Sequence, residues 1–258
     1  MWNIPRKQWA LQLFIQHQNN YMKKIIIATL FLLSANTFAQ GIFGKNPYKN
    51  QQQWDQQTVH YGYFLGFSSY NAKFDYSKSY HDKHGSEEIL VQPSVGFNVG
   101  LVGNLRLMEY LDLRFEPGLY YTKRTLLYPH ILDKTIGNRE VTSTYIHFPL
   151  LLKFSALRTG NIRPYILAGF SESLNLSSNE TSKEDNYDGR FRMRKWTANY
   201  ELGLGIDLYF EHFKFSPSIR GVFGLQDELI RDRNVNSPWT GDIESMKTRG
   251  LFVNFTFH

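Results

Sequence analysis

The chain has 258 residues, no cysteine and a formal net charge of +6. The absence of cysteine excludes a disulfide framework, thiolate metal ligands and a lipid-modified cysteine at the N-terminus. Four of the basic residues lie within the first 24 positions, ahead of the cleavage site described below. The chain that remains after cleavage would carry a net charge of +2, which gives no reason to expect a nucleic-acid partner.

Three segments precede the first predicted strand. Residues 1–21 end before a second methionine, and we interpret them as an upstream start assigned in error, with a functional amphipathic leader as the alternative. Residues 22–39 have a basic start, a nine-residue apolar run and the ending Thr-Phe-Ala, typical of a secretory signal peptide cleaved after Ala39. Such a run is too short to cross about 30 Å of hydrocarbon as a helix. Residues 40–57 are rich in glutamine, and we expect a flexible periplasmic segment.

Residues 58–258 show the alternation of membrane β-strands, and the longest example is 196–210. There every even position is apolar, whereas the odd positions carry polar residues, glycines and one tyrosine. Because successive side chains of a strand point to opposite faces, one face is apolar along its whole length. Ordinary strands have about five or six residues, whereas about ten residues at a tilt near 45° cross a bilayer. The pattern therefore indicates a strand that spans a membrane.

The same alternation predicts eight strands, at 61–68, 95–107, 111–119, 145–154, 163–175, 196–210, 213–223 and 251–257. Leu167 and Glu172 interrupt the alternation of apolar and polar residues in the fifth strand, so its inner and outer faces are not assigned. Short turns at 108–110, 156–162 and 210–212 alternate with long polar connections at 71–93, 123–143, 176–195 and 226–248. This rhythm is typical of an outer-membrane barrel with periplasmic turns and extracellular loops.

The predicted fold is therefore all-β, an eight-stranded antiparallel up-and-down transmembrane β-barrel with both termini in the periplasm. The alternative is a soluble β-sandwich or a lipocalin-like barrel, which would present polar outer faces. Several aromatic residues near strand ends are expected to form girdles at the membrane interfaces. They are Tyr61, Tyr110, Tyr120, Tyr121, Trp196, Tyr209 and Phe210.

Nine charged residues are predicted to face the lumen. They are Arg106, Asp112, Arg114, Glu116, Lys153, Glu201, Asp207, Lys214 and Arg220. A barrel of eight strands is just wide enough for its own side chains to fill, and buried charges need partners. We therefore expect a charge-paired plug and not a diffusion pore. The tight turn at 210–212 predicts contacts of Asp207 with Lys214 and of Glu201 with Arg220.

One group of residues could support catalysis. Ser143, Tyr145 and His147 share a face of the fourth strand, and Ser171 and Glu201 lie on the next two strands. A serine, a histidine and a carboxylate at one level could form a catalytic triad. No ordered active-site motif accompanies them, so we favour a hydrogen-bonded lumen histidine and a protein that is not an enzyme.

A possible metal site lies in the first long connection. His81 and His84, followed by Glu87 and Glu88, offer ligand atoms, but two histidines around a lysine are a weak pattern. We favour a solvated loop and expect no metal and no cofactor.

Four segments resemble one family. They are GLVGNLRLMEYLDLRFEPGLYY at 100–121, STYIHFPLLLKF at 143–154, FKFSPSIRGVF at 213–223 and NSPWTG at 236–241. Together they are similar to PorT, called SprT in gliding bacteria, an outer-membrane barrel of the type IX secretion system of Bacteroidetes. The resemblance covers most of residues 59–258.

This resemblance implies a non-enzymatic part in the export of proteins with a C-terminal sorting domain, and in gliding motility where that occurs. It implies other type IX secretion components and outer-membrane lipid as partners, and it supplies no catalytic residues. A lipid-directed outer-membrane enzyme and a small adhesion barrel remain the alternatives.

Overall fold

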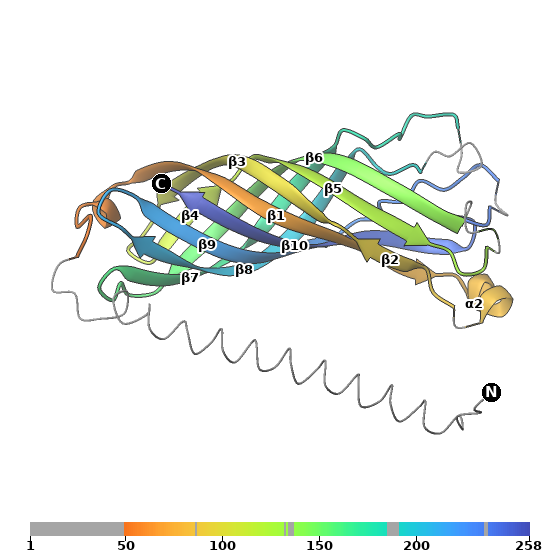
Figure 1. Cartoon of the computed structure of the whole chain (residues 1–258), viewed down its shortest axis with the longest axis horizontal. Coiled ribbons are helices and arrows are strands. Elements are labelled where there is room, and N and C mark those ends of the chain that lie inside the picture. The colour runs from red at the N-terminus through yellow and green to blue at the C-terminus, as the bar shows by residue number, and fades with distance from the viewer. Residues whose placement is uncertain (1–48, 86, 132, 134–136, 185–190, 235–236) are drawn as a thin grey trace, which may run out of the picture. The chain divides into compact units, whose positions relative to one another are not determined.

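The computed structural model describes residues 49–258, except 86, 132, 134–136, 185–190 and 235–236. The predicted upstream start at 1–21, the signal peptide at 22–39 and residues 40–48 lie outside the described residues. The unit Asn50–His258 is an antiparallel β-sheet closed into a barrel (Figure 1). Within the part of the chain that the structure describes, no helix is long and apolar enough to cross a membrane.

The described residues of the barrel form ten strands and two short helices. The strands are β1 (Val59–Tyr76), β2 (Leu90–Pro93), β3 (Val95–Arg106), β4 (Leu111–Phe115), β5 (Gly118–Leu127), β6 (Asn138–Ser155), β7 (Ile162–Asn175), β8 (Trp196–Tyr209), β9 (Lys214–Gly224) and β10 (Ile243–Phe257). The helices are η1 (Trp54–Gln56) and α2 (Lys78–His84).

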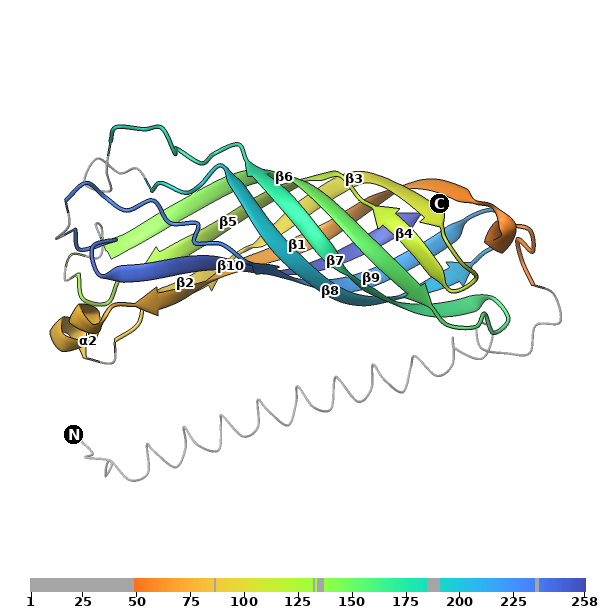
Figure 2. The same cartoon turned by 180° about the vertical axis from the view of Figure 1, so that it is seen from behind.

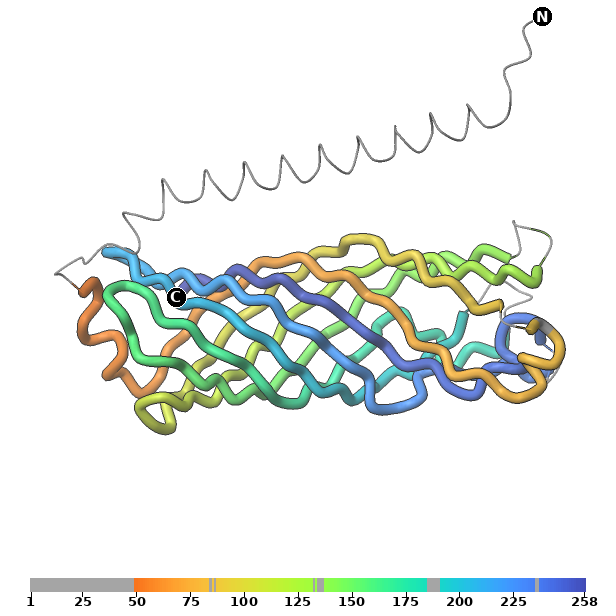
Figure 3. Tube along the Cα trace, turned by 90° about the horizontal axis from the view of Figure 1, so that it is seen from below, coloured from red at the N-terminus to blue at the C-terminus, as the bar shows by residue number. Residues whose placement is uncertain are grey.

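The ten strands form a ring of eight, which confirms the predicted fold class. β2 and β3 follow each other with only Ser94 between them, and β4 and β5 are separated only by Glu116 and Pro117. Proline has no N–H for a ladder hydrogen bond, which accounts for the second interruption. β1 pairs with both β3 and β10, so that the ring is closed along the body of the wall. The views from behind and from below show the strands slanting around the same closed wall (Figures 2 and 3).

The side-chain facing agrees with the predicted alternation. On β8, Leu204 is 61% exposed on the outer face, whereas Glu201 and Asp207 are each 1% exposed in the lumen. The unassigned β7 places Tyr165 and Leu167 inside, where Leu167 packs with Leu151 of β6. The register of the wall is therefore the one that the apolar positions require.

Four strands run further than predicted at the end of the barrel with the long connections. β1 continues to Tyr76, β5 reaches Leu127, β6 begins at Asn138 and β10 begins at Ile243. Beyond the apolar band the outer face becomes polar, so the alternation disappears while the backbone ladder continues. We call this end, with connections 77–89, 128–137, 176–195 and 225–242, the loop end. The opposite end, with connections 107–110, 156–161 and 210–213, is the turn end.

Two aromatic residues that we expected in the interfacial girdles lie inside the barrel instead. Tyr120 is fully buried and Tyr209 is 3% exposed. Tyr120 packs with Phe64 and Phe252 in the lumen, with ring centroids 6.2 and 4.8 Å away. The prediction was wrong because it used the position along the strand and ignored the alternation, which places both tyrosines on the inner face.

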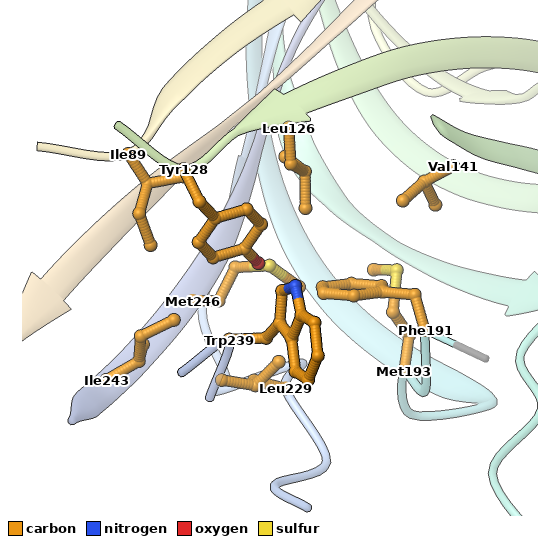
Figure 4. Close-up of a cluster of buried hydrophobic side chains, with 10 residues drawn as sticks. All are labelled: Ile89, Leu126, Tyr128, Val141, Phe191, Met193, Leu229, Trp239, Ile243 and Met246. Atoms are coloured by element: carbon orange, nitrogen blue, oxygen red, sulfur yellow. The ribbon is translucent and has the colours of Figure 1, made fainter. Parts of the chain in front are cut away.

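The loop end contains a hydrophobic cluster, which we call the loop-end cap (Figure 4). Its ten buried residues come from β5, β6 and β10 and from all four of the connecting segments at the loop end. They are Ile89, Leu126, Tyr128, Val141, Phe191, Met193, Leu229, Trp239, Ile243 and Met246. An antiparallel bridge between Met193 and Leu229 joins two of those segments. The described parts of the long connections are thus packed against one another.

Candidate functional site in the barrel lumen

A five-residue group of charged and polar side chains crosses the lumen, and we call it the Arg220 network. Arg220 of β9 donates from Nη1 to Glu116 Oε2 at 2.7 Å, and its Nε lies 2.9 Å from Glu201 Oε2. Glu116 also pairs with Arg114 of β4, and Glu201 Oε1 accepts from His147 Nε2 at 2.6 Å. All five side chains are at least 98% buried. The predicted contact between Glu201 and Arg220 is therefore present.

The arrangement of the Arg220 network explains how buried charges are tolerated. Two guanidinium groups face two carboxylates, so that their formal charges cancel. Further donors and acceptors come from the wall, since Arg114 Nη2 bonds Thr256 Oγ1 at 3.0 Å and Arg220 Nη2 bonds Tyr120 Oη at 3.2 Å. In a low-dielectric lumen, an unpaired buried charge is far more costly than a paired one. The ion pairs therefore hold these side chains in one arrangement.

The histidine of this network has a serine neighbour, but not one that we predicted. His147 Nδ1 lies 2.7 Å from Ser173 Oγ of β7, whereas the candidates Ser143 and Ser171 have no hydrogen bond to it. The Ser173 hydroxyl also accepts from Asn199 Nδ2 at 3.0 Å, and the side chain is 5% exposed. Glu201 is already paired with Arg220. A serine, a histidine and a carboxylate are thus in contact, as part of a packed lumen.

A second group surrounds Asp207 nearer the turn end. Lys153 Nζ donates to Asp207 Oδ2 at 2.5 Å, and Ser216 Oγ donates to Asp207 Oδ1 at 2.6 Å. Lys214 Nζ lies 3.8 Å from the same carboxylate, which is the contact that we expected across the tight turn. The second lysine shares the aspartate with the first, so this group has an excess of positive charge.

The last two predicted lumen charges do not join these groups. Arg106 is partly exposed and donates to the backbone carbonyl of Asp55. Asp112 lies opposite Arg106 in the β3–β4 register and opposite Lys153 in the β4–β6 register, yet forms no ion pair within 4 Å among the described residues. Both residues lie at the turn end of the lumen.

The turn end is covered by residues 50–57, which we call the N-terminal cap. Asp55 accepts a hydrogen bond from Tyr209 Oη at 2.6 Å and pairs with Arg158 and Arg163 at 3.1 and 3.4 Å. Trp54 stacks on His60, with ring centroids 4.9 Å apart. Residues 50–57, which belong to the segment predicted as flexible, therefore contact the barrel through Trp54 and Asp55.

The pKa of Asp55 reflects this environment. Burial alone would raise the pKa of the carboxyl group, but the hydrogen bond from Tyr209 and the guanidinium group of Arg158 outweigh it. The pKa therefore lies below its ordinary value, and Asp55 is ionised at neutral pH. The cap is attached by a carboxylate that keeps its charge.

A buried carboxyl group also lies beneath the loop-end cap. Glu228 is 1% exposed and accepts from the backbone N–H and the hydroxyl of Thr248, at 3.0 and 2.7 Å. Burial raises the pKa of Glu228, and these two bonds only partly oppose that effect. Glu228 could not be singled out from the sequence, because it lies in a polar connection.

The proposed metal ligands of the first long connection are arranged differently from the solvated loop that we favoured. Part of the segment forms the helix α2, in which His81 Nδ1 lies 3.2 Å from the Gly85 carbonyl oxygen. Lys83 pairs with Asp242 at 2.9 Å. Among the described residues there is no group of three histidine, cysteine, aspartate or glutamate side chains that could hold a metal ion.

Comparison with known proteins agrees with this architecture. Residues 38–229 match the family described as the outer membrane protein beta-barrel domain. The chain belongs to this family. It is thus an outer-membrane β-barrel of the bacterial envelope, and its exposed apolar wall faces lipid.

Three solved structures illustrate what this family member is similar to. The outer membrane protein OprG from Pseudomonas aeruginosa is 13% identical, with 77% of this chain and 92% of that chain covered and a TM-score of 0.40. Neisserial surface protein A is 8% identical, with 78% and 98% covered and a TM-score of 0.40. The outer membrane protease OmpT from Escherichia coli is 10% identical, with 77% and 95% covered and a TM-score of 0.41. Values this low carry no information about activity. A comparison with curated proteins gives no significant match.

Proposed function

We propose that this barrel is a non-enzymatic component of the type IX secretion machinery, required for export of proteins with a C-terminal sorting domain and, where it occurs, for gliding motility. The proposal rests on the resemblance of four segments to PorT. One structural observation supports it: around the Arg220 network the described lumen is filled by paired charges and aromatic rings, which favours a barrel that acts through its surfaces. A filled lumen suits docking of partners better than passage or turnover of a substrate.

The proposal includes an orientation, with the loop end outside the cell and the turn end and both termini in the periplasm. The partners are then other secretion components, reached either from the loop end or from the N-terminal cap. The chain has no cysteine, so a single introduced cysteine gives a unique crosslinking position. Lys195 at the loop end and Glu211 at the turn end are both exposed, so Lys195→Cys and Glu211→Cys place the crosslinker at either end of the barrel.

Deletion followed by complementation tests the function. We expect loss of extracellular cargo that carries the sorting domain, accumulation of that cargo in the periplasm, and an unchanged mass of lipid A. Normal cargo secretion in the deletion strain would contradict the proposal. Crosslinking from the two single-cysteine variants, followed by mass spectrometry, then identifies the partner and the end that it contacts.

A lipid-directed hydrolase is the second candidate, because Ser173, His147 and Glu201 are in hydrogen-bond contact. Ser173→Ala separates it from the first. If the protein is an enzyme, Ser173→Ala should abolish its lipid product while the barrel stays folded. If it is a secretion component, the same variant should leave both cargo export and lipid composition unchanged. We expect the second result, since the hydroxyl is held inside the packed lumen.

A further inference from the structure

The outer faces of β1 and β10 change abruptly from apolar to basic toward the loop end. These two strands run side by side along the wall (Figure 1). Phe67 and Leu251 are the last large apolar residues on this outer face, and they are 56% and 53% exposed. The outward positions beyond them are Ser69, Asn71 and Lys73 on β1 and Arg249 and Lys247 on β10, where Arg249 directly follows Leu251 on the outer face.

The residues on either side of these basic residues along the strands show which way the basic side chains point. Ala72 and Phe74 pack against the loop-end cap, and Met246 and Thr248 are buried. Because side chains alternate along a strand, the residues between them point away from the barrel. Lys73, Lys247 and Arg249 therefore project outward at the border of the lipid-facing band, and we call these three residues the basic rim.

The basic rim has more positive charge than the protein neutralises. Lys73 and Lys247 are directly opposite each other in the register, an arrangement that destabilises a sheet when no counter-ion is present. Lys73 pairs with Asp75 at 3.0 Å, but neither Lys247 nor Arg249 has an ion-pair partner among the described residues. The nearby carboxylates on the loop-end segments are Asp227, which pairs with Arg231, and Glu244 of β10. The rim and Asp75 together carry a net charge of +2.

We propose that the basic rim binds the phosphate group of a membrane lipid in the leaflet at the loop end. Residues opposite each other in a sheet are about 5 Å apart, and alternate residues of one strand are about 7 Å apart. The three cationic groups can therefore converge on one phosphate, with Arg249 offering the planar pair of donors that suits its oxygens. The acyl chains of the same lipid would lie along the apolar band below, against Phe67 and Leu251.

The position at the edge of the band favours a lipid over a dissolved anion. A lipid presents its phosphate at the height where the outer face changes from apolar to polar, and its chains supply the contact with the adjoining residues. This lipid binding requires only that the barrel is embedded in a membrane, so it is independent of the proposed role in secretion.

Binding measurements on the purified full-length barrel test the proposal. The barrel in nonionic detergent is titrated with phosphatidic acid, with phosphatidylcholine and with inorganic phosphate. Each basic residue near an anionic surface changes affinity about five-fold, so Lys247→Gln with Arg249→Gln should weaken phosphatidic acid binding roughly 25-fold. Binding of phosphatidylcholine should not change between the variant and the wild type.

The matched control removes the same charge elsewhere. Lys78→Gln with Lys195→Gln neutralises two exposed lysines of the loop end that are not part of the basic rim, and it should retain wild-type affinity for phosphatidic acid. Heat-modifiability on gels establishes that each variant is folded, and if the first variant fails to fold, Arg249→Gln alone should weaken phosphatidic acid binding about five-fold. Equal loss in the control, unchanged affinity in the rim variant, or equally tight binding of inorganic phosphate would each overturn the proposal.

Discussion

Removing Arg220 is the most informative perturbation of the lumen. Its guanidinium group contacts both Glu116 and Glu201, and the alanine variant leaves the Arg220 network with one excess negative charge. Each carboxylate keeps one partner, Arg114 for Glu116 and His147 for Glu201. Loss of one member of a buried ion pair costs about 3–5 kcal/mol, and we expect Arg220→Ala to lie in that range.

The second substitution identifies the cause of this loss. Adding Glu201→Gln to Arg220→Ala removes the stranded carboxylate, so the double variant should recover about 1–2 kcal/mol relative to the sum of the single variants. Urea unfolding of the barrel in lipid vesicles gives the free energies, and heat-modifiability on gels gives an independent ranking. Arg194→Ala, which removes an exposed arginine of a loop, is the control and should change stability by less than about 0.5 kcal/mol. Strictly additive single effects would mean that the two side chains do not interact, and the account of a paired lumen would be wrong.

Four further predictions follow from the wall, the cap and the leader. Leu204→Arg should lower the stability of the barrel by about 2–4 kcal/mol because the residue faces lipid. Unchanged resistance to heat would mean that the predicted register of the strand is wrong by one residue. Gly205→Ala should lower the unfolding temperature, since the new Cβ would lie 2.5 Å from a tyrosine ring, while Gly103→Ala, with 4.0 Å to its nearest atom, should not. Asp55→Asn should speed hydrogen exchange of the N-terminal cap at pH 7. The pKa of this carboxyl group is lowered in the folded protein. Its contribution to the stability of the N-terminal cap is therefore complete above the ordinary pKa of 3.8, and it is lost only as the pH falls through the lower folded pKa. Mass spectrometry of the membrane-embedded protein should find Gln40 at the N-terminus, and a chain that begins before residue 22 would contradict the signal-peptide assignment.

The strand number and facing could be predicted because a membrane wall imposes strict alternation. A lipid-facing position must be apolar and the next one must face the lumen, so Leu204 and Asp207 could be placed from the sequence alone. The same rule places Tyr120 and Tyr209 inside, as the structure does. The ends of β1 and β10 could not be predicted, because past Leu251 both faces of the sheet meet water or protein and the composition no longer alternates.

The lumen contacts were predictable only between neighbouring strands. Glu201 and Arg220 lie on β8 and β9, where a tight turn sets the register. The contacts between Arg220 and Glu116, and between Lys153 and Asp207, join parts of the wall that do not pair with each other. Their existence depends on the tilt and closure of the sheet, which no local pattern encodes. The N-terminal cap was missed for the same reason, since Asp55 meets Arg158 and Tyr209 only after closure.

The ladder between β1 and β10 also determines when this protein can be inserted. It joins Tyr63 to Phe257 and Tyr76 to Ile243, so almost the entire chain must be released before its first bond forms. Bringing together residues so far apart in the chain carries an entropic cost of about 5 kcal/mol beyond a constant. Until then β1 and β9 would be open edges, whose unpaired backbone groups hydrocarbon cannot satisfy. Entry into the bilayer is therefore coupled to the arrival of the last fifteen-residue strand, and truncation within β10 should block assembly instead of producing a smaller barrel.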